Sequence, residues 1–116
     1  MKKLILIIAL GTIWACESST FDEIAEEMQQ PELVRYNEHI KPIIDANCIE
    51  CHNPGGVSSF RPLTNYTEVK TAVQETNLLE RIQMQNGETG QMPQTGRMPQ
   101  HLIDLVLRWN QHGLLE

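Results

Sequence analysis

The spacing of apolar residues along the chain predicts helices. From residue 36 onward, apolar positions recur at intervals of three and four, a period that gathers them on one face of a helix. In the first such segment, residues 36–46, that face consists of Tyr36, Ile40, Ile43 and Ile44. Asn37 is a candidate N-cap, and Pro42 falls near the first turn, where its missing N–H costs least.

Three more helices are predicted after residue 60. Asn65, with Glu68 three residues later, has the pattern of a capping box at the start of the first of them. Residues 77–84 form a second, short helix, and the third begins near Pro99 and ends before Gly113. The expected inward residues are Tyr66, Val69, Ala72 and Val73, then Leu78, Leu79 and Ile82, then Leu102, Leu105, Val106 and Trp109.

The segments between these helices have the residues of turns and loops. Residues 53–56, with the sequence Asn-Pro-Gly-Gly, predict a turn, and residues 60–63 an extended loop. Residues 85–97 contain four glycine or proline positions and no helical period, which predicts a longer loop. The chain has neither a strand pattern nor an internal repeat, so the predicted fold class is all-α with one small domain.

The start of the chain predicts export. Residues 1–15 have the pattern of a signal peptide, because two lysines precede an apolar run that is shorter than the ~20 residues of a membrane span. The run ends at Ala15-Cys16, and this end resembles the lipobox of bacterial lipoproteins. The resemblance implies cleavage before Cys16 and attachment of lipid to that residue. Ordinary cleavage near Ala15, which leaves Cys16 as a free thiol, is the alternative.

Acidic residues dominate the segment that follows. Residues 17–32 contain six acidic residues and no lysine or arginine, which predicts a solvated tether over residues 16–35 and a domain over residues 36–116. Loss of two lysines with the signal peptide changes the formal charge from −6 to −8. Such a charge argues against a nucleic-acid partner and favours a protein partner with a basic docking face. A lipid anchor implies a membrane-bound protein that faces the periplasm or the cell exterior.

The candidate chemistry is concentrated at residues 48–52. Cys48, Cys51 and His52 form a C-x-x-C-H motif, which is typical of covalent c-type haem attachment. Two thiols three positions apart lie on one side of a helical turn, so both can add to the two vinyl groups at one edge of a porphyrin. His52 then lies under the iron as its proximal ligand. In bacteria this attachment takes place outside the cytoplasmic membrane, which agrees with the export signal.

Other uses of the cysteines fit the sequence less well. A thioredoxin-like redox pair needs a βαβ context, which the chain lacks. A structural zinc site needs four nitrogen or sulfur ligands, but only Cys48, Cys51 and scattered histidines remain once Cys16 carries lipid. Three cysteines cannot form a disulfide framework, because one is always left over. One covalent haem c is therefore the expected cofactor, and no catalytic residue is expected.

From Ile40 to its end the chain resembles the small class I cytochrome c domains of the planctomycete-type group. The matching residues are 40–56, 63–66 and 79–82, then Met92-Pro93, Trp109 and Gly113. The resemblance covers about 75 residues. The resemblance implies a helical domain around one covalent haem, with Trp109 packed on the first helix. It also implies that the distal iron ligand is the methionine of the Met-Pro pair before the last helix. Counted back from Trp109 this is Met92, and Met98, which also precedes a proline, is the alternative.

The remaining candidates for the iron are Met28, Met84, His39, His101 and His112. Met28 lies in the predicted tether, and Met84 lies at a helix end, where methionine is more typical of a core. The three histidines are expected to be solvated side chains. His39 lies on the first predicted helix, and His101 and His112 lie at the start and the end of the last one. None of the five is preferred to Met92.

The sequence also suggests residues around the ligands. The second ring nitrogen of His52 is expected to donate to a backbone carbonyl, that of Pro54 or Pro62. Arg61 is a candidate partner for a haem propionate, and a surface role is equally compatible with its position. The expected protein is a lipid-anchored electron carrier with His/Met ligation, not an enzyme. A haem-based sensor, in which the distal methionine dissociates or never binds, is the alternative.

Overall fold

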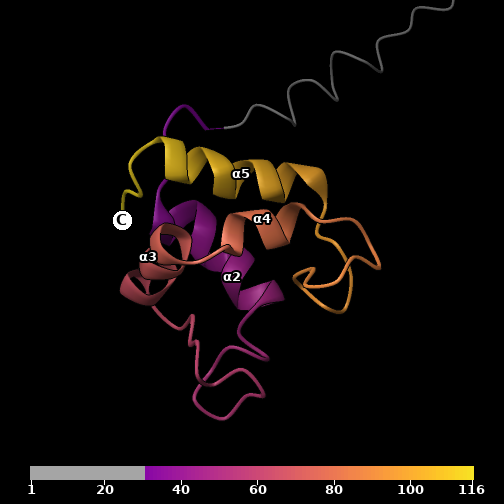
Figure 1. The fold of residues 1–116 in the computed structure, drawn as a ribbon. Coiled ribbons are helices and arrows are strands. Elements are labelled where there is room, and N and C mark those ends of the chain that lie inside the picture. The colour runs from indigo at the N-terminus through magenta and orange to yellow at the C-terminus, as the bar shows by residue number, and fades with distance from the viewer. Residues whose placement is uncertain (1–30) are drawn as a thin grey trace, which may run out of the picture.

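The computed structural model describes residues 31–116, which fold into helices and loops with no strand among them. The elements in chain order are a π-helix, η1 (Tyr36–Ile40), and the α-helices α2 (Lys41–Asn47), α3 (Tyr66–Glu75), α4 (Leu78–Gln83) and α5 (Gln100–Gln111). Figure 1 shows α5 along the upper side of the molecule, with the other helices beneath it. The all-α prediction is confirmed for these residues. The predicted signal peptide, Cys16 and Met28 lie outside the described residues.

The first predicted helix is present as η1 followed directly by α2. The Lys41 N–H donates to the Tyr36 carbonyl five residues earlier, which is the hydrogen bond of a π-turn. Pro42, near the start of α2, has no N–H to donate, so the hydrogen-bond pattern changes where the ladder is interrupted. Asn37 is not the N-cap, because Arg35 holds that position in an extended conformation. The predicted apolar face is buried as expected, with Tyr36, Ile40, Ile43 and Ile44 all in the core.

Asn65 is the N-cap of α3, as the predicted capping box requires. The return contact of Glu68 differs from the prediction, because its carboxylate reaches back to Thr64. The Asn65 side chain accepts a hydrogen bond from the Glu68 N–H at 3.0 Å, as an N-cap does. The Glu68 carboxylate returns to Thr64, one residue before the cap, where it accepts from the N–H at 2.7 Å and from the hydroxyl at 2.8 Å. The Thr64 hydroxyl and N–H stabilise the charged form and hold the pKa of Glu68 below its ordinary value.

The other two helices start and end close to their predicted positions. Helix α4 lies within residues 77–84, and α5 begins after Pro99. Helix α5 ends in a Schellman motif, in which the Leu114 N–H donates to the Trp109 carbonyl. Gly113 has a φ of +84°, the left-handed conformation that favours glycine after a helix. Within residues 31–116 no helix has the length and apolar character needed to cross a membrane.

Trp109 lies at the centre of the core. It is fully buried, and its ring centroid is 5.7 Å from that of Tyr36 and 6.3 Å from that of Tyr66. The contact with Tyr36 places α5 against η1, the packing that the family resemblance implies. The Trp109 Nε1–H donates to the Leu115 carbonyl at 2.7 Å, and the Tyr66 hydroxyl donates to the Leu114 carbonyl at 2.8 Å. The last residues of the chain are therefore held on an aromatic cluster.

The buried face of α5 is rotated relative to the prediction. Ile103, Val106 and Trp109 are buried, whereas Leu102 and Leu105 are only partly buried. Apolar residues at adjacent positions allow two neighbouring stripes on a helix of 3.6 residues per turn, and tertiary packing selects between them. The predicted inward residues of α3 and α4 divide into buried Val69, Val73 and Ile82 and partly buried Tyr66, Ala72, Leu78 and Leu79.

Residues 31–35 belong to the packed unit, although their sequence predicted a tether. Val34 is fully buried, and its N–H donates to Nδ1 of His112 at 3.0 Å. The Arg108 guanidinium donates to the Pro31 carbonyl at 2.8 Å. One buried valine and two hydrogen bonds thus fasten this segment to the end of α5. The packed unit starts earlier than the predicted boundary at residue 36.

Candidate functional site

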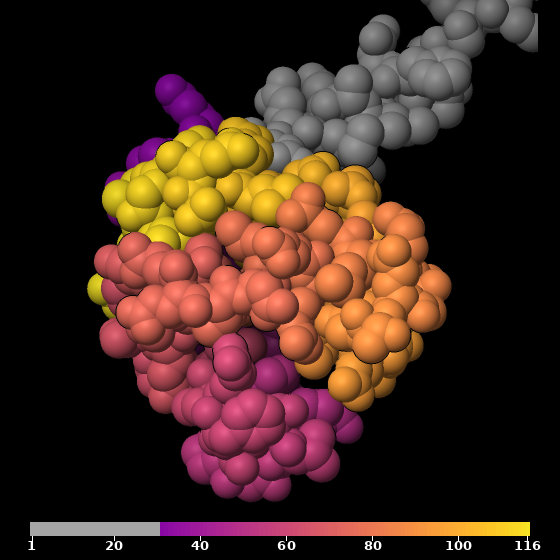
Figure 2. All heavy atoms as spheres, in the orientation of Figure 1, coloured from indigo at the N-terminus to yellow at the C-terminus, as the bar shows by residue number. Residues whose placement is uncertain are grey.

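An apolar cavity lies between the helices and the two long loops of the domain. Its volume is about 260 Å³. Its apolar lining consists of Ile43, Ile44, Phe60, Leu63, Ala72, Leu78, Ile82, Met92, Pro93, Met98 and Val106. The loop of residues 51–63 (magenta) stands out from the lower end of the molecule in Figure 2, and it contributes to one wall of the cavity. A concave apolar site with a few polar groups is the ordinary form of a cofactor pocket.

Cys48 and His52 line this cavity, whereas Cys51 does not. Helix α2 ends at Asn47, and the N–H groups of Cys51 and His52 both donate to the Cys48 carbonyl, at 3.2 and 3.0 Å. The motif therefore forms one further turn at the end of the helix. Cys48 is partly buried, Cys51 is exposed, and both are free thiols. Burial raises the pKa of the Cys48 thiol to about 11, because the thiolate would lose its hydration.

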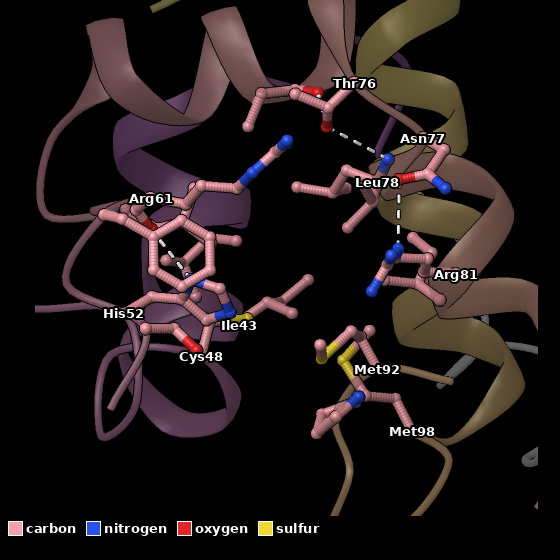
Figure 3. Close-up of a pocket in the computed structure, with 18 residues that line it drawn as sticks. Ile43, Cys48, His52, Arg61, Thr76, Asn77, Leu78, Arg81, Met92 and Met98 are labelled. Carbon is pink, nitrogen blue, oxygen red and sulfur yellow. Dashed lines mark hydrogen bonds between the residues drawn. The ribbon is translucent and has the colours of Figure 1, made fainter. Parts of the chain in front are cut away.

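The His52 ring is oriented by the loop that follows it. Its Nδ1 lies 2.7 Å from the Arg61 carbonyl oxygen (Figure 3). A carbonyl oxygen only accepts, so Nδ1 is the donor, and in the neutral ring Nε2 then has the free lone pair. The predicted acceptors, Pro54 and Pro62, are wrong, because the loop returns to the ring one residue before Pro62. The Leu63 N–H also donates to the His52 carbonyl, at 2.9 Å, which closes the loop on the motif.

Gly56 allows this loop to pass close to the motif. A Cβ atom at residue 56 would lie 2.2 Å from the Cys51 carbonyl oxygen and 2.7 Å from its carbon, both of them backbone atoms. The Gly56 N–H donates to the Asn53 carbonyl at 3.0 Å, and the Ser58 N–H donates to the Cys51 carbonyl at 2.9 Å. The predicted turn at residues 53–56 is confirmed, and its last glycine is required by close approach to the Cys51 peptide.

A Gly56→Ala substitution is expected to destabilise the domain by about 1–3 kcal/mol, because the loop must move away from the Cys51 peptide. Gly55→Ala is the matched control, since a Cβ there meets only the Asn53 side-chain oxygen, at 3.4 Å. Denaturant unfolding of both variants against the wild type measures the difference. Equal midpoints for the two variants would contradict the close approach at residue 56.

Met92 and Met98 lie on the wall opposite His52. Figure 3 shows both sulfur atoms directed into the cavity, across from the His52 ring. Met98 is 4% exposed and belongs to the core, whereas Met92 is partly buried. The Met92 N–H donates to the Arg81 carbonyl at 3.1 Å, so the loop is fastened to α4 at this residue. The structure thus brings together Cys48, His52 and both candidate methionines.

The loop between α4 and α5 is organised by Gln91, which nothing in the sequence pattern marked. Gln91 is 7% exposed, and its Oε1 accepts from the Gly87 N–H at 3.0 Å. Its Nε2 donates to the Asn86 Oδ1 and to the Pro93 carbonyl, both at 3.1 Å. Glycine and proline spacing predicts such a loop, but the burial of one of its glutamines depends on tertiary contacts.

The other histidines lie away from the cavity lining. His101 is exposed, as expected for a solvated side chain. His39 and His112 are partly buried, and each accepts a backbone N–H at Nδ1, from Arg35 at 3.1 Å and from Val34 at 3.0 Å. The prediction of solvated side chains is wrong for these two, which instead hold the segment that enters the domain.

No protein-family model matches the chain, and no curated protein or solved structure matches it. Within residues 31–116, no three or more His, Cys, Asp and Glu side chains are grouped so that they could hold a metal ion. The chemistry that the cavity offers is one imidazole and one thiol on one wall, from His52 and Cys48, and two thioethers on the other, from Met92 and Met98.

Proposed function

We propose that this chain is a lipid-anchored monohaem c-type cytochrome that carries single electrons between redox partners. The observation that carries the proposal is the arrangement across the cavity. Cys48 and His52 on one wall face the sulfur atoms of Met92 and Met98 on the other. An imidazole opposite a thioether is the ligand pair of electron-transfer cytochromes c, in which both axial positions of the iron are filled.

Three features of the residues present fit a haem. The cavity lining is mostly apolar, which suits the faces of a porphyrin. The hydrogen bond from Nδ1 of His52 to the Arg61 carbonyl fixes the tautomer whose Nε2 can bind iron. Cys48 faces the cavity as a free thiol, which suits a thioether to a cofactor held there. Cys51 is also a free thiol, but it is exposed and lies outside the lining, so its position adds nothing to this fit.

The residues of the chain have separate tasks in this function. A bound haem supplies a reversible one-electron couple at its iron. His52 and one of the two methionines, Met92 or Met98, would hold the iron of that group. Cys48 and Cys51 would secure the cofactor as thioethers, each formed by addition of S–H across a vinyl double bond without net oxidation. The excess of acidic residues favours a basic partner protein, and Cys16 keeps the carrier at the membrane.

Expression of the full chain in a bacterium that matures c-type cytochromes tests the proposal. The wild-type protein is expected to keep its haem on a denaturing gel and to give a low-spin spectrum in the reduced state. A Cys48→Ser/Cys51→Ser variant is expected to lose covalent haem. Cys16→Ser is the matched control, expected to keep the haem and to leave the membrane fraction.

Two outcomes would overturn the proposal. Absence of covalent haem from the wild-type protein, in a host that matures a reference cytochrome, would show that the chain is not a c-type cytochrome. Rapid binding of carbon monoxide to a high-spin ferrous form would instead favour the haem-based sensor, since a carrier with both axial positions filled binds added ligands slowly.

A further inference from the structure

Arg81 presents a charged group to the cavity whose function the ligand arrangement does not explain. It lies on α4, is partly buried, and lines the cavity beside Leu78 and Met92. Its Nε–H donates to the Asn77 Oδ1 at 3.0 Å. Figure 3 shows the guanidinium between Asn77 and Met92, with its terminal nitrogens toward the cavity. Among residues 31–116, no carboxylate forms an ion pair with it.

Among the described residues, no hydrogen bond or ion pair occupies the terminal nitrogens of the Arg81 guanidinium. Arginine has five N–H donors and stays charged, and the hydrogen bond to Asn77 uses one of the donors. A charge on a largely apolar wall is unfavourable unless an anion accompanies it. A planar group with two parallel donors is suited above all to a carboxylate. The wall of α4 is therefore built for an acidic group of whatever molecule the cavity holds.

Arg61 is the other arginine of the cavity, and its environment differs. Its side chain is exposed and comes from the loop of the opposite wall. Among the described residues no side-chain hydrogen bond holds its guanidinium, whereas its backbone carbonyl is bonded to His52. A long side chain without such support loses more conformational entropy when it binds an anion. Between the two, Arg81 is the pre-organised cation.

We infer that Arg81, oriented by Asn77, binds a carboxylate of the cofactor in this cavity. The inference rests on the proposed function, because the acidic groups in question are the propionates of a haem. It replaces Arg61 as the expected propionate partner. Since the Arg81 carbonyl also holds the Met92 N–H at 3.1 Å, one residue of α4 would fix both an edge of the cofactor and the loop of its distal ligand.

The reduction potential of the holoprotein between pH 5 and pH 9 tests this inference. A cation beside the carboxylate keeps it ionised, so the wild-type potential is expected to change little with pH over this range. In Arg81→Gln the carboxylate is expected to titrate about one pH unit or more higher, which makes the potential pH-dependent. The potential of that variant at high pH is expected to lie below that of the wild type, because an unpaired negative charge favours the ferric state. Arg81→Lys is expected to restore the wild-type profile in part.

Arg61→Gln is the matched control and is expected to leave the profile unchanged. A profile of Arg81→Gln that superimposes on the wild type, or a shift seen only in Arg61→Gln, would overturn the inference. A purely structural role of Arg81 would lower the melting temperature without moving the pH profile, and this result also counts against it. Covalent haem content is measured first. Its absence from the wild type would refute the proposed function, whereas the pH profiles of haem-loaded variants test the role of Arg81 alone.

Discussion

A Met92→Leu variant is expected to lose the sixth iron ligand while it keeps its covalent haem. Leucine has nearly the volume of methionine, so the packing cost is expected to stay below about 1.5 kcal/mol. It has no sulfur, so the charge-transfer absorption of a thioether-bound ferric haem is expected to disappear. The potential is expected to fall, because a thioether stabilises the ferrous state. Absorption spectra and redox titration of the purified holoprotein measure both effects.

Met98→Leu is the matched control for this experiment. Met98 is 4% exposed and belongs to the core. Its replacement is therefore expected to change the free energy of unfolding and to leave the charge-transfer band in place. Both sulfur atoms point into the same cavity, and the choice of Met92 comes from the family resemblance. Loss of the band in Met98→Leu, with the band retained in Met92→Leu, would show that Met98 is the ligand.

The second large effect is expected at Trp109. A Trp109→Ala variant is expected to lose about 3–5 kcal/mol of stability, from a domain whose total is on the order of 5–15 kcal/mol. The indole is fully buried, contacts Tyr36 and Tyr66, and holds the C-terminal residues through the Leu115 carbonyl. Trp109→Phe keeps an aromatic ring and loses the hydrogen bond, so a smaller loss is expected. Denaturant unfolding of the purified variants against the wild type measures both losses.

Asn110→Ala is the control on the same helix, since the Asn110 side chain is exposed and has no hydrogen bond among the described residues. Its unfolding midpoint is expected to stay close to that of the wild type. If Trp109→Ala unfolded within about 0.5 kcal/mol of this control, the range of ordinary surface substitutions, Trp109 would not be the centre of the core.

The helices could be predicted because local signals and packing agree in them. The apolar face of residues 36–46 is buried, Asn65 is an N-cap, and α4 and α5 end where their flanking residues indicated. The π-helix η1 was not predicted, because the missing N–H of Pro42 indicates an interrupted ladder but not the form that the preceding turn takes. The rotation of α5 toward Ile103 also depends on which neighbouring helix covers it. The period of the apolar residues predicts that a helix has a buried face. Tertiary contacts decide which of the apolar residues on the helix lie at the centre of that face.

Of the residues of the candidate site, those that the motifs marked could be predicted, whereas the contacts that position them could not. Spacing alone marks Cys48, Cys51 and His52. The acceptor of the His52 ring is a backbone carbonyl, and every residue has one, so sequence could not single out Arg61. Gln91 and Arg81 are ordinary polar residues whose roles appear only when two loops and a helix enclose a cavity.

The attachment of residues 31–35 to the end of α5 gives the domain a defined orientation. The chain enters beside α5, at the upper end of Figure 1, and the loop of residues 51–63 projects from the lower end. Any anchor that acts through the preceding residues therefore pulls on the face farthest from that loop. For the carrier proposed above, such an attachment would leave the loop of residues 51–63 on the side away from the surface that holds the domain.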